Sequence, residues 1–552
     1  MKQLIQLYKL SIPAVIMATS LVSLQSCDLE KEPLTSLSET AFWSDGSSAK
    51  LALTSLYRGS IPNGVEFTSH DFWSYHGLLL MDHLSDNAFD RRGENNLFFG
   101  ISSGKLVNTN SFILEYWKSA YYRISLCNRF LANISSLDDS EENRRYRAEA
   151  RFLRATQYHY LASYFKDVPL VTTILTGEES NNVTKETQAN ILSWTETEFR
   201  EAAKDLPRFK DLSSNENGRA TKQAALAFLG RSLLLEKKWR EAAEVYKEII
   251  DFGDNQIHSS YRELFWPDAG IANKENIFYI QYLENYLGCG MPQHNLSAKD
   301  GGWSLSNPTA SFFEEFEFID GTPFSYNDPR YNPDNLGENR DPRLDYSIYY
   351  NGAIFKGTEY KLSPDNDASK KEKIDYASEC SKTGFMWRKY FDENTINDIT
   401  SYSAVTPVIR YAEILLSYLE SKIEAGDQIT QADLDLSINQ IRRRADVQMP
   451  PITETQSEKL RQPVRHERRI ELSLEGIRYW DILRWHIAED VLVGPIWGAP
   501  YPKSPNYASQ TKEIDPTGNF RWYVGRRDFR NPQDYTWPIP LSEQNINPNL
   551  RE

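Results

Sequence analysis

The chain has 552 residues, of which 40% are hydrophobic, 13% aromatic and 25% charged, and its formal net charge is −15. This length and hydrophobic content support a substantial core, in one large domain or in two to three smaller ones. The negative charge argues against nucleic acid as a partner, because phosphate binding needs a basic face. It also argues against a body that docks electrostatically on anionic lipid.

The N-terminus is typical of a targeting segment. Lys2 and Lys9 give a basic start, and the apolar run 12–24 is shorter than the roughly 20 residues of a membrane helix. Cys27 follows, where a lipoprotein signal peptide is cleaved. We therefore expect removal of residues 1–26 and acylation of Cys27, and an ordinary secretory signal that contains a cysteine is the alternative. Each buried CH₂ contributes about 0.8 kcal/mol, so two or more chains would anchor the protein stably.

Cysteine is otherwise sparse. Cys127, Cys289 and Cys380 remain, an odd number, and no CxxC occurs, so neither a disulfide framework nor a zinc site is expected. Cys127 lies in a helical pattern and is interpreted as a small buried hydrophobic residue. A bridge between Cys289 and Cys380 stays open as an alternative.

Residues 27–45 are expected to form a lipidated tether, and residues 46–252 a mostly helical N-terminal region. Two helices are indicated by apolar residues at helical spacing, the first with Trp117, Tyr121, Ile124, Asn128 and Leu131, the second with Ala148, Phe152, Ala155, His159 and Ala162. His159 lies on the apolar stripe, so we interpret it as a core histidine rather than a ligand-binding one.

The clearest internal signal is a tetratricopeptide-like helix pair at 223–256. The matching residues are Leu226, Leu229, Gly230, Leu233, Ala242 and Tyr246, with a small residue where the helices cross. A second pair is predicted at 407–446. Its first helix carries Ile409, Ala412, Leu416, Leu419 and Ile423 and ends at Gly426. Thr430 and Asp433 then suggest a capping box before Leu434, Ile438, Ile441 and Ala445.

The stretch between the helix pairs is different in kind. Residues 253–405 contain few helix signals and many glycines and prolines, so we predict an irregular, loop-rich insertion. Residues 406–552 form the C-terminal region, with tetratricopeptide-like helices and a mostly loop-like end from 490 onward. Long loops within a compact protein are commonly functional.

Several segments, in order along nearly the whole mature chain, resemble the SusD/RagB family of nutrient-binding outer-membrane lipoproteins. The strongest match is the block RHERRIEL at 465–472 followed by EGIRYWD at 475–481 and RW at 484–485. Further matches are 117–128, AEARFLRA at 148–155, DVPL at 167–170, RDPRL at 340–344, RYAE at 410–413 and WPIP at 537–540. The tail 549–552 lacks the family's usual aromatic ending, and the acidic run 28–32 resembles the surface-export signal of Bacteroidota lipoproteins.

This resemblance implies an all-α fold of about four tetratricopeptide-like helix pairs with the irregular subdomain inserted. It implies no catalysis and no cofactor. It implies a SusC-like TonB-dependent transporter as partner, a glycan or, in some relatives, a peptide as ligand, and a lipid-anchored position on the outside of the outer membrane.

The basic run 465–469 is interpreted as part of an internal salt-bridge lattice, because Glu467, Glu471, Glu475 and Asp481 lie at helical neighbour spacings. Residues 442–444 are interpreted as a solvated or paired helix face. No catalytic motif singles out a carboxylate pair, a GxSxG serine or an HExxH metal site. Asp86, Asn87 and Asp90 could supply calcium ligands, although the twelve-residue calcium loop is absent.

Two irregular, aromatic-rich regions, 71–99 and 282–303, are the candidates for a ligand site. Flat aromatic faces in loops suit sugar rings, and such contacts contribute about 0.5–1.5 kcal/mol beyond burial. We predict a platform of Trp303, Tyr286 and Phe98, with Asn96 and Arg91 bonding hydroxyls or carboxylates. Trp73 and Tyr282 are further candidates, and any of these residues could instead serve packing.

The function predicted from the sequence is capture of oligo- or polysaccharide for import. The alternatives are an oligopeptide-binding lipoprotein of the same importer type, an enzyme, and a tetratricopeptide scaffold that recognises only proteins. The irregular, aromatic middle argues against the scaffold, because a scaffold would show a more regular repeat.

Overall fold

The computed structural model describes residues 43, 46–58, 71–362, 381–505 and 507–551. The predicted signal peptide, Cys27 and Cys380 lie outside these residues, so the cleavage and lipidation predictions and the Cys289–Cys380 alternative are not addressed by the structure. Cys127 and Cys289 are buried free thiols. Burial raises the pKa of Cys127 to about 12, as expected for a packed and unreactive side chain.

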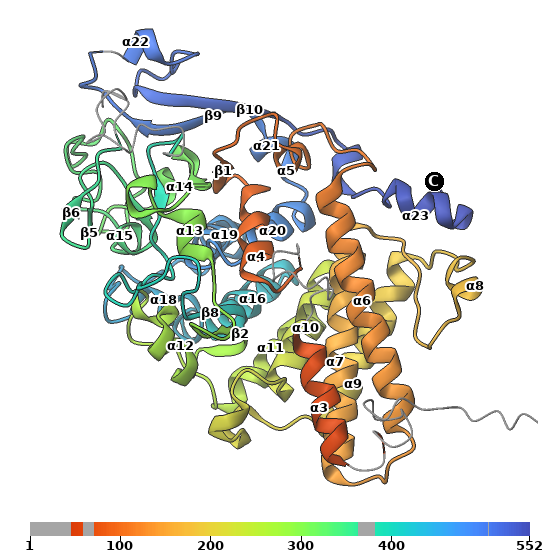
Figure 1. Ribbon diagram of the computed structural model, residues 1–552. Coiled ribbons are helices and arrows are strands. Elements are labelled where there is room, and N and C mark those ends of the chain that lie inside the picture. The colour runs from red at the N-terminus through yellow and green to blue at the C-terminus, as the bar shows by residue number, and fades with distance from the viewer. Residues whose placement is uncertain (1–42, 44–45, 59–70, 363–380, 506, 552) are drawn as a thin grey trace, which may run out of the picture.

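A row of long helices, each packed on the next, forms the right-hand half of the molecule in Figure 1 and continues toward its centre. In packing order these are α6 (Ser111–Ile134), α7 (Glu141–Tyr164), α9 (Gln188–Asp205), α10 (Lys222–Leu235), α11 (Trp239–Phe252), α16 (Tyr411–Glu424) and α19 (Ser457–Glu471). The first helix of the described residues, α3 (Gly46–Arg58), lies against α6 and α7. Both helices predicted around 117–131 and 148–162 are confirmed.

Polar side chains cap the N-termini of α6, α7, α9 and α10. The side chains of Asn110, Ser140, Thr187 and Thr221 each accept a hydrogen bond from a backbone N–H in the first turn. Each such cap satisfies a donor that the helix cannot satisfy itself, and losing one typically costs about 1 kcal/mol.

The helix pair predicted at 223–256 is confirmed as α10 and α11. Gly230 lies at the crossing, directly against the buried ring of Tyr246. A Cβ at Gly230 would lie 2.4 Å from the Tyr246 ring carbon Cζ, closer than any real contact. The small residue is therefore needed because the two helices approach each other closely at this point.

The second predicted pair is confirmed at its turn. Gly426 follows α16 with a φ of 74°, a left-handed conformation that glycine adopts without strain. The Thr430 hydroxyl accepts from the Asp433 backbone N–H, and the Asp433 carboxylate accepts from the Thr430 backbone N–H. This is the reciprocal cap that the sequence indicated.

The helices on either side of this turn differ from the prediction. Ile409 belongs to a strand, β8 (Ala404–Arg410), because its backbone pairs with the neighbouring β2 strand at Phe278. The second helix is broken at Ser437 into α17 (Gln431–Leu436) and α18 (Ile438–Arg442). Ala445 lies beyond both helices.

The irregular half lies beside the row of long helices, on the left in Figure 1. It is confirmed as loop-rich, but short antiparallel strand pairs that the sequence did not indicate tie it together. These are β1 (Ala88–Asp90) with β3 (Ser306–Pro308), β2 (Asn276–Tyr282) with β8, β4 (Ile348–Tyr349) with β7 (Met386–Trp387), and β5 (Ile354–Phe355) with β6 (Thr358–Glu359). The predicted C-terminal loop contains a further pair, β9 (Val493–Pro500) with β10 (Arg521–Asp528), which runs along the upper edge of Figure 1.

Short helices complete the connections. They are α4 (Tyr75–His83), α5 (Leu97–Gly100), α8 (Gly177–Ser180), α12 (Pro267–Ala272), α13 (Met291–Asn295), α14 (Ala310–Glu315), α15 (Arg343–Ser347), α20 (Arg478–Arg484), α21 (Ala488–Val491), α22 (Tyr507–Gln510) and α23 (Leu541–Ile546). Single 3₁₀ turns occur at Phe209–Asp211, Ser214–Glu216, Glu263–Phe265, Ala298–Asp300, Gln533–Tyr535 and Pro548–Leu550. In the described part of the chain, every helix is too short or too polar to cross a bilayer.

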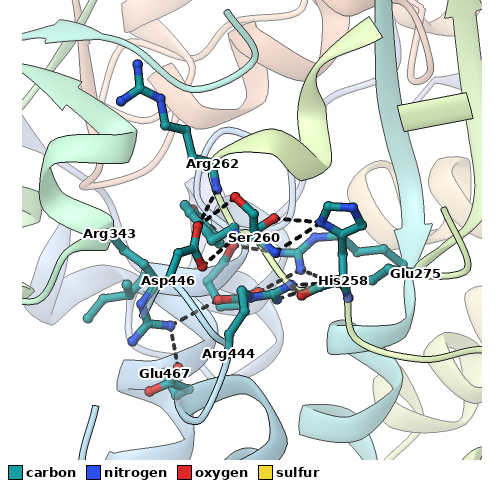
Figure 2. Close-up of polar contacts among 12 residues, drawn as sticks. His258, Ser260, Arg262, Glu275, Arg343, Arg444, Asp446 and Glu467 are labelled. Carbon is teal, nitrogen blue, oxygen red and sulfur yellow. Dashed lines mark hydrogen bonds and ion pairs between the residues drawn. The ribbon is translucent and has the colours of Figure 1, made fainter. Parts of the chain in front are cut away.

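Charged side chains, in addition to apolar ones, join the row of long helices to the irregular half. We call the buried set Glu275, Arg343, Arg410, Arg442, Arg444, Glu467 and Glu471 the arginine–carboxylate lattice, part of which is drawn in Figure 2. Glu471 accepts from Arg444 at 2.6 Å, Arg410 at 2.8 Å and Arg343 at 3.0 Å. Burial opposes the charge of Glu471, but these arginines outweigh it and hold its pKa well below the usual range.

Ion pairs within and beside the lattice confirm the interpretation of the basic runs. Arg468 pairs with Asp481 at 3.1 Å, and Arg469 with Glu315 at 2.5 Å. Of the run 442–444, Arg442 and Arg444 are buried within the lattice, whereas Arg443 is exposed. His159 is confirmed as a core residue, because it is fully buried and its ring nitrogen Nδ1 lies 3.0 Å from the Ser232 hydroxyl.

Candidate functional site

A pocket of about 880 Å³ opens between α3 and the end of β2, and we call it the α3–β2 pocket. Its wall comes from α3, the loop that enters α4, one residue of α6, the turn 215–219, and the end of β2 with the loop that follows it. The volume lies within the range of about 300–1,000 Å³ that small-molecule sites occupy. Residues 59–70, which join α3 to the loop before α4, lie outside the described residues.

Aromatic side chains from two regions face this pocket, as the sequence predicted for a ligand site. Trp73 and Tyr282 line its floor and are buried, whereas Tyr286 is 87% exposed at its rim. The Tyr282 hydroxyl accepts a hydrogen bond of 2.8 Å from the Tyr75 backbone N–H. This bond fixes the end of β2 to the start of α4, so three of the seven predicted ligand-binding residues line one pocket.

Arg123 of α6 holds the floor in place. Its guanidinium carbon lies 4.3 Å from the centre of the Trp73 ring, and its Nη2 lies 3.0 Å from the Asp71 carboxylate. Its Nε donates to the Leu56 carbonyl at 3.2 Å. One buried cation therefore connects α6 to the end of α3 and to the loop before α4, and the Trp73 face gains a cation–π contact.

The turn 215–219 is fixed from beneath by α7. Arg219 donates to Glu149 at 2.7 Å and to Glu216 at 2.8 Å. The Tyr57 hydroxyl donates to Glu149 at 2.5 Å and accepts from the Ala220 backbone N–H at 3.0 Å. Burial and then the Glu149 carboxylate raise the pKa of Tyr57 well above its usual value, so this phenol stays a donor at neutral pH.

Trp303, the remaining exposed aromatic of the prediction, is 38% exposed and belongs to a neighbouring series of rings. We call Trp303, His294, His76 and Tyr75 the aromatic strip. The ring centres of Trp303 and His294 are 5.0 Å apart, and those of His294 and His76 are 4.6 Å apart. Tyr75 lies 5.9 Å from His294 and 5.6 Å from Tyr282, so the strip reaches the pocket floor.

The loop that presents Trp303 depends on two glycines. Gly301 has a φ of 83°, and a Cβ at Gly302 would lie 2.2 Å from the Leu296 carbonyl oxygen. The Trp303 backbone N–H then donates to the Gln293 carbonyl at 2.7 Å. The tight return of the chain explains why this loop needs consecutive glycines, and it fixes the indole beside His294.

Phe98 is not part of an exposed platform, and neither it nor Asn96 lines the pocket. Phe98 has no exposed surface, because its ring packs edge-on against Phe112 at 5.0 Å. The Asn96 amide oxygen instead starts α5, accepting from the Phe98 backbone N–H at 2.7 Å. Arg91 is half-buried after β1, and its backbone N–H donates to the Leu305 carbonyl, two residues from Trp303.

The two carboxylates of the possible calcium site, Asp86 and Asp90, form ion pairs with arginines instead. Asp86 pairs with Arg478 at 2.8 Å and with Arg469 at 3.1 Å, and Asp90 pairs with Arg92 at 2.6 Å. Burial opposes the charge of Asp86, but the two arginines outweigh it and lower its pKa well below the usual range. These carboxylates therefore already have cationic partners.

Sequence reasoning missed residues that matter to the site. Tyr57, Arg123 and Arg219 lie in or beside helices, where nothing local separates a pocket residue from a solvated helix face. His76 and His294 are more than two hundred residues apart, and only the fold places their rings together. Their aromatic-rich surroundings were the one available signal.

Comparison with known proteins gives consistent matches. A profile described as the SusD family matches residues 274–552, and one described as starch-binding associating with outer membrane matches residues 69–234. The crystal structure of a SusD-like carbohydrate-binding protein from Bacteroides fragilis is 66% identical, covers 92% of this chain and 100% of its own, and superposes with a TM-score of 0.90. A SusD-like protein of Formosa agariphila is 23% identical, over 87% of this chain and 92% of its own. A laminarin-binding SusD-like protein shares the fold, at 19% identity and a TM-score of 0.66 over 91% of this chain and 97% of its own.

Proposed function

Because the chain belongs to the SusD family, we propose that it captures oligo- or polysaccharide at the cell surface and delivers it to a SusC-like TonB-dependent transporter. Its relatives are binding proteins without catalytic activity, and the chain is a binding protein of the same kind. The family is associated with the outer membrane. The ligand is captured and handed on unchanged.

One observation carries the proposal that the ligand is a glycan. The α3–β2 pocket has the exposed Tyr286 at its rim and is connected through the aromatic strip to the exposed Trp303. Exposed aromatic faces beside hydroxyl and amide groups suit sugar rings, whose C–H faces stack while their hydroxyls form hydrogen bonds. The carbohydrate-binding relative, similar over its whole length, supports the same ligand class.

The anchoring proposal rests on the sequence of the first thirty residues. Acylated Cys27 would hold the protein on the outer face of the outer membrane. We expect Cys27→Ala to release the protein into the medium or the soluble fraction. A variant that stays on the membrane through detergent-free washes would show that the transporter or another contact is the anchor.

Tethering is important for a site of this kind. Exchanging the hydrogen bonds of a sugar from water to protein gives only a small net gain, so affinity at a single site is expected to be weak. A protein held beside its transporter transfers ligand at a high effective concentration, which offsets the weak affinity.

The experiment that tests this function is an array of plant, microbial and host polysaccharides together with mixed peptides. The probe is purified protein without residues 1–27, and the same samples are assayed for released sugar. We expect binding to a glycan with no sugar released. Binding to peptides alone would move the function to an oligopeptide importer, and sugar release would contradict capture without turnover.

A further inference from the structure

We propose that the α3–β2 pocket selects uncharged sugar chains and excludes those that bear carboxylate or sulfate groups. The inference rests on the proposed function, because it specifies the substrate class of the same site. Its basis is that the arginines of the pocket wall are already matched by carboxylates of the protein.

The first matched pair lies at the pocket floor. Arg123 and Asp71 are both buried, and Arg123 Nη2 lies 3.0 Å from the Asp71 carboxylate. An anionic sugar group at Arg123 would share one cation with Asp71 and place two negative charges side by side. Arg123 Nη1 is buried as well and has no hydrogen-bond partner among the described residues.

The second matched group lies in the turn 215–219. All three guanidinium nitrogens of Arg219 are engaged: Nε and Nη2 donate to Glu149 at 3.0 and 2.7 Å, and Nη1 donates to Glu216 at 2.8 Å. Arg145 also pairs with Glu216 at 3.0 Å. The bidentate fork that recognises carboxylate or sulfate is therefore already taken by protein carboxylates.

The rest of the polar wall is neutral. Thr54, Ser55, Asn215, Asn217 and Gln281 bring hydroxyls and amides, which combine donors with acceptors as sugar hydroxyls do. Within the described wall, Lys50 is the remaining charged residue, and it is exposed on α3, where solvent and salt screen its charge. Among its described residues, the wall therefore presents hydrogen-bonding groups, and each of its arginines is paired with a carboxylate.

The net charge of −15 repels polyanions as well, and the two causes can be separated by salt. Repulsion by the whole protein acts at long range and is screened at about 0.5 M salt, where the Debye length is about 4 Å. Exclusion by matched charges inside the wall acts at contact distance and persists in salt.

The test measures affinity for matched polymer pairs by calorimetry and affinity electrophoresis, with the mature chain lacking its lipidated residue. Two pairs share a backbone and differ in charge: hydroxyethyl cellulose against carboxymethyl cellulose, and dextran against dextran sulfate. Two further neutral polymers, laminarin and mannan, are compared with two anionic ones, alginate and pectin. We expect the polymers that bind to be neutral. The affinity for each of them should exceed the affinity for its anionic counterpart by at least about tenfold, at both about 0.05 and 0.5 M salt.

Three variants locate the effect. Tyr286→Ala should weaken binding of the neutral polymer several-fold, whereas Phe520→Ala, which removes an exposed ring outside the pocket, should leave it unchanged. Lys50→Ala tests whether any binding of an anionic polymer comes from this exposed cation. Binding of anionic polymers that is lost in salt or in Lys50→Ala would overturn the inference and leave glycan capture standing. Equal binding of both members of a pair would overturn it too. Binding to no polysaccharide of either class, with binding to peptides, would overturn the proposed function and this inference with it.

Discussion

Arg443 and Arg444 are neighbours in the chain with opposite surroundings, so the same substitution at each tests the arginine–carboxylate lattice directly. Arg444 has no exposed side-chain surface, and it donates to Glu275 at 2.8 Å, to Glu471 at 2.6 Å and to the His258 carbonyl at 2.7 Å. Figure 2 shows Glu275 and His258 on the same side of Arg444, to its right. The side chain of Arg443 is 53% exposed and lies 3.8 Å from Asp435.

The perturbation is Arg444→Met, which keeps much of the side-chain volume and removes the charge. Breaking a buried ion pair by removing one partner costs about 3–5 kcal/mol, because it leaves an uncompensated buried charge. Arg410 and Arg343 remain on Glu471, and Arg410 remains on Glu275, so we expect the lower end, about 3 kcal/mol. For Arg443→Met, an exposed pair predicts less than about 1 kcal/mol.

The assay is urea unfolding of both variants and the wild type at neutral pH, followed by circular dichroism and tryptophan fluorescence. The free energy of unfolding is compared at a common slope, and the two signals are checked for coincidence. A loss below about 1 kcal/mol for Arg444→Met, or equal losses in the two variants, would refute the view that the lattice holds the two halves together.

Three further outcomes are expected. Trp303→Ala should lower glycan affinity several-fold while the melting temperature holds, and Phe520→Ala, which removes a similarly exposed ring just before β10, should leave affinity unchanged; equal affinity of Trp303→Ala and wild type would remove Trp303 from the site. Burial, followed by the nearby Arg231, lowers the pKa of His159 to about 3, so its contribution to stability is lost as the pH falls below about 6.5, where the unfolded histidine takes up a proton. Between pH 7.5 and 5 the wild type should therefore lose about 2 kcal/mol more unfolding free energy than His159→Gln, and parallel losses in urea titrations would contradict this. Burial raises the pKa of the Cys127 thiol to about 12, so iodoacetamide at pH 8 should alkylate it only after unfolding, as read by peptide mass spectrometry. Alkylation in the native protein would show that the packing around α6 opens.

Sequence reasoning located the long helices because their signals are local. Apolar spacing placed α6 and α7, and Gly230, Gly426 and the Thr430–Asp433 cap marked turns whose geometry depends on a few adjacent residues. Ile409 shows the limit of periodicity. It fits a helical stripe, but pairing with a strand more than one hundred residues away decides its conformation.

The candidate site was predictable as a region and not as a set of residues. The aromatic-rich stretches 71–99 and 282–303 do contribute Tyr286, Trp303 and the pocket floor. Phe98 and Trp303 have similar sequence surroundings, yet one is buried against Phe112 and the other is exposed beside His294. Which of two loop aromatics faces solvent depends on tertiary packing, and no local pattern encodes that choice.

The wall of the α3–β2 pocket is assembled from segments near residues 50, 73, 123, 217 and 282. Such a site has a high contact order, because segments far apart in the sequence must meet before the wall exists. We therefore expect it to form late in folding, after the local helix pairs, and a fragment would need residues 50–287 to contain all of the described wall. A ligand that binds only the assembled wall would therefore stabilise the complete fold over every partly folded form, and its binding would report that the fold is complete.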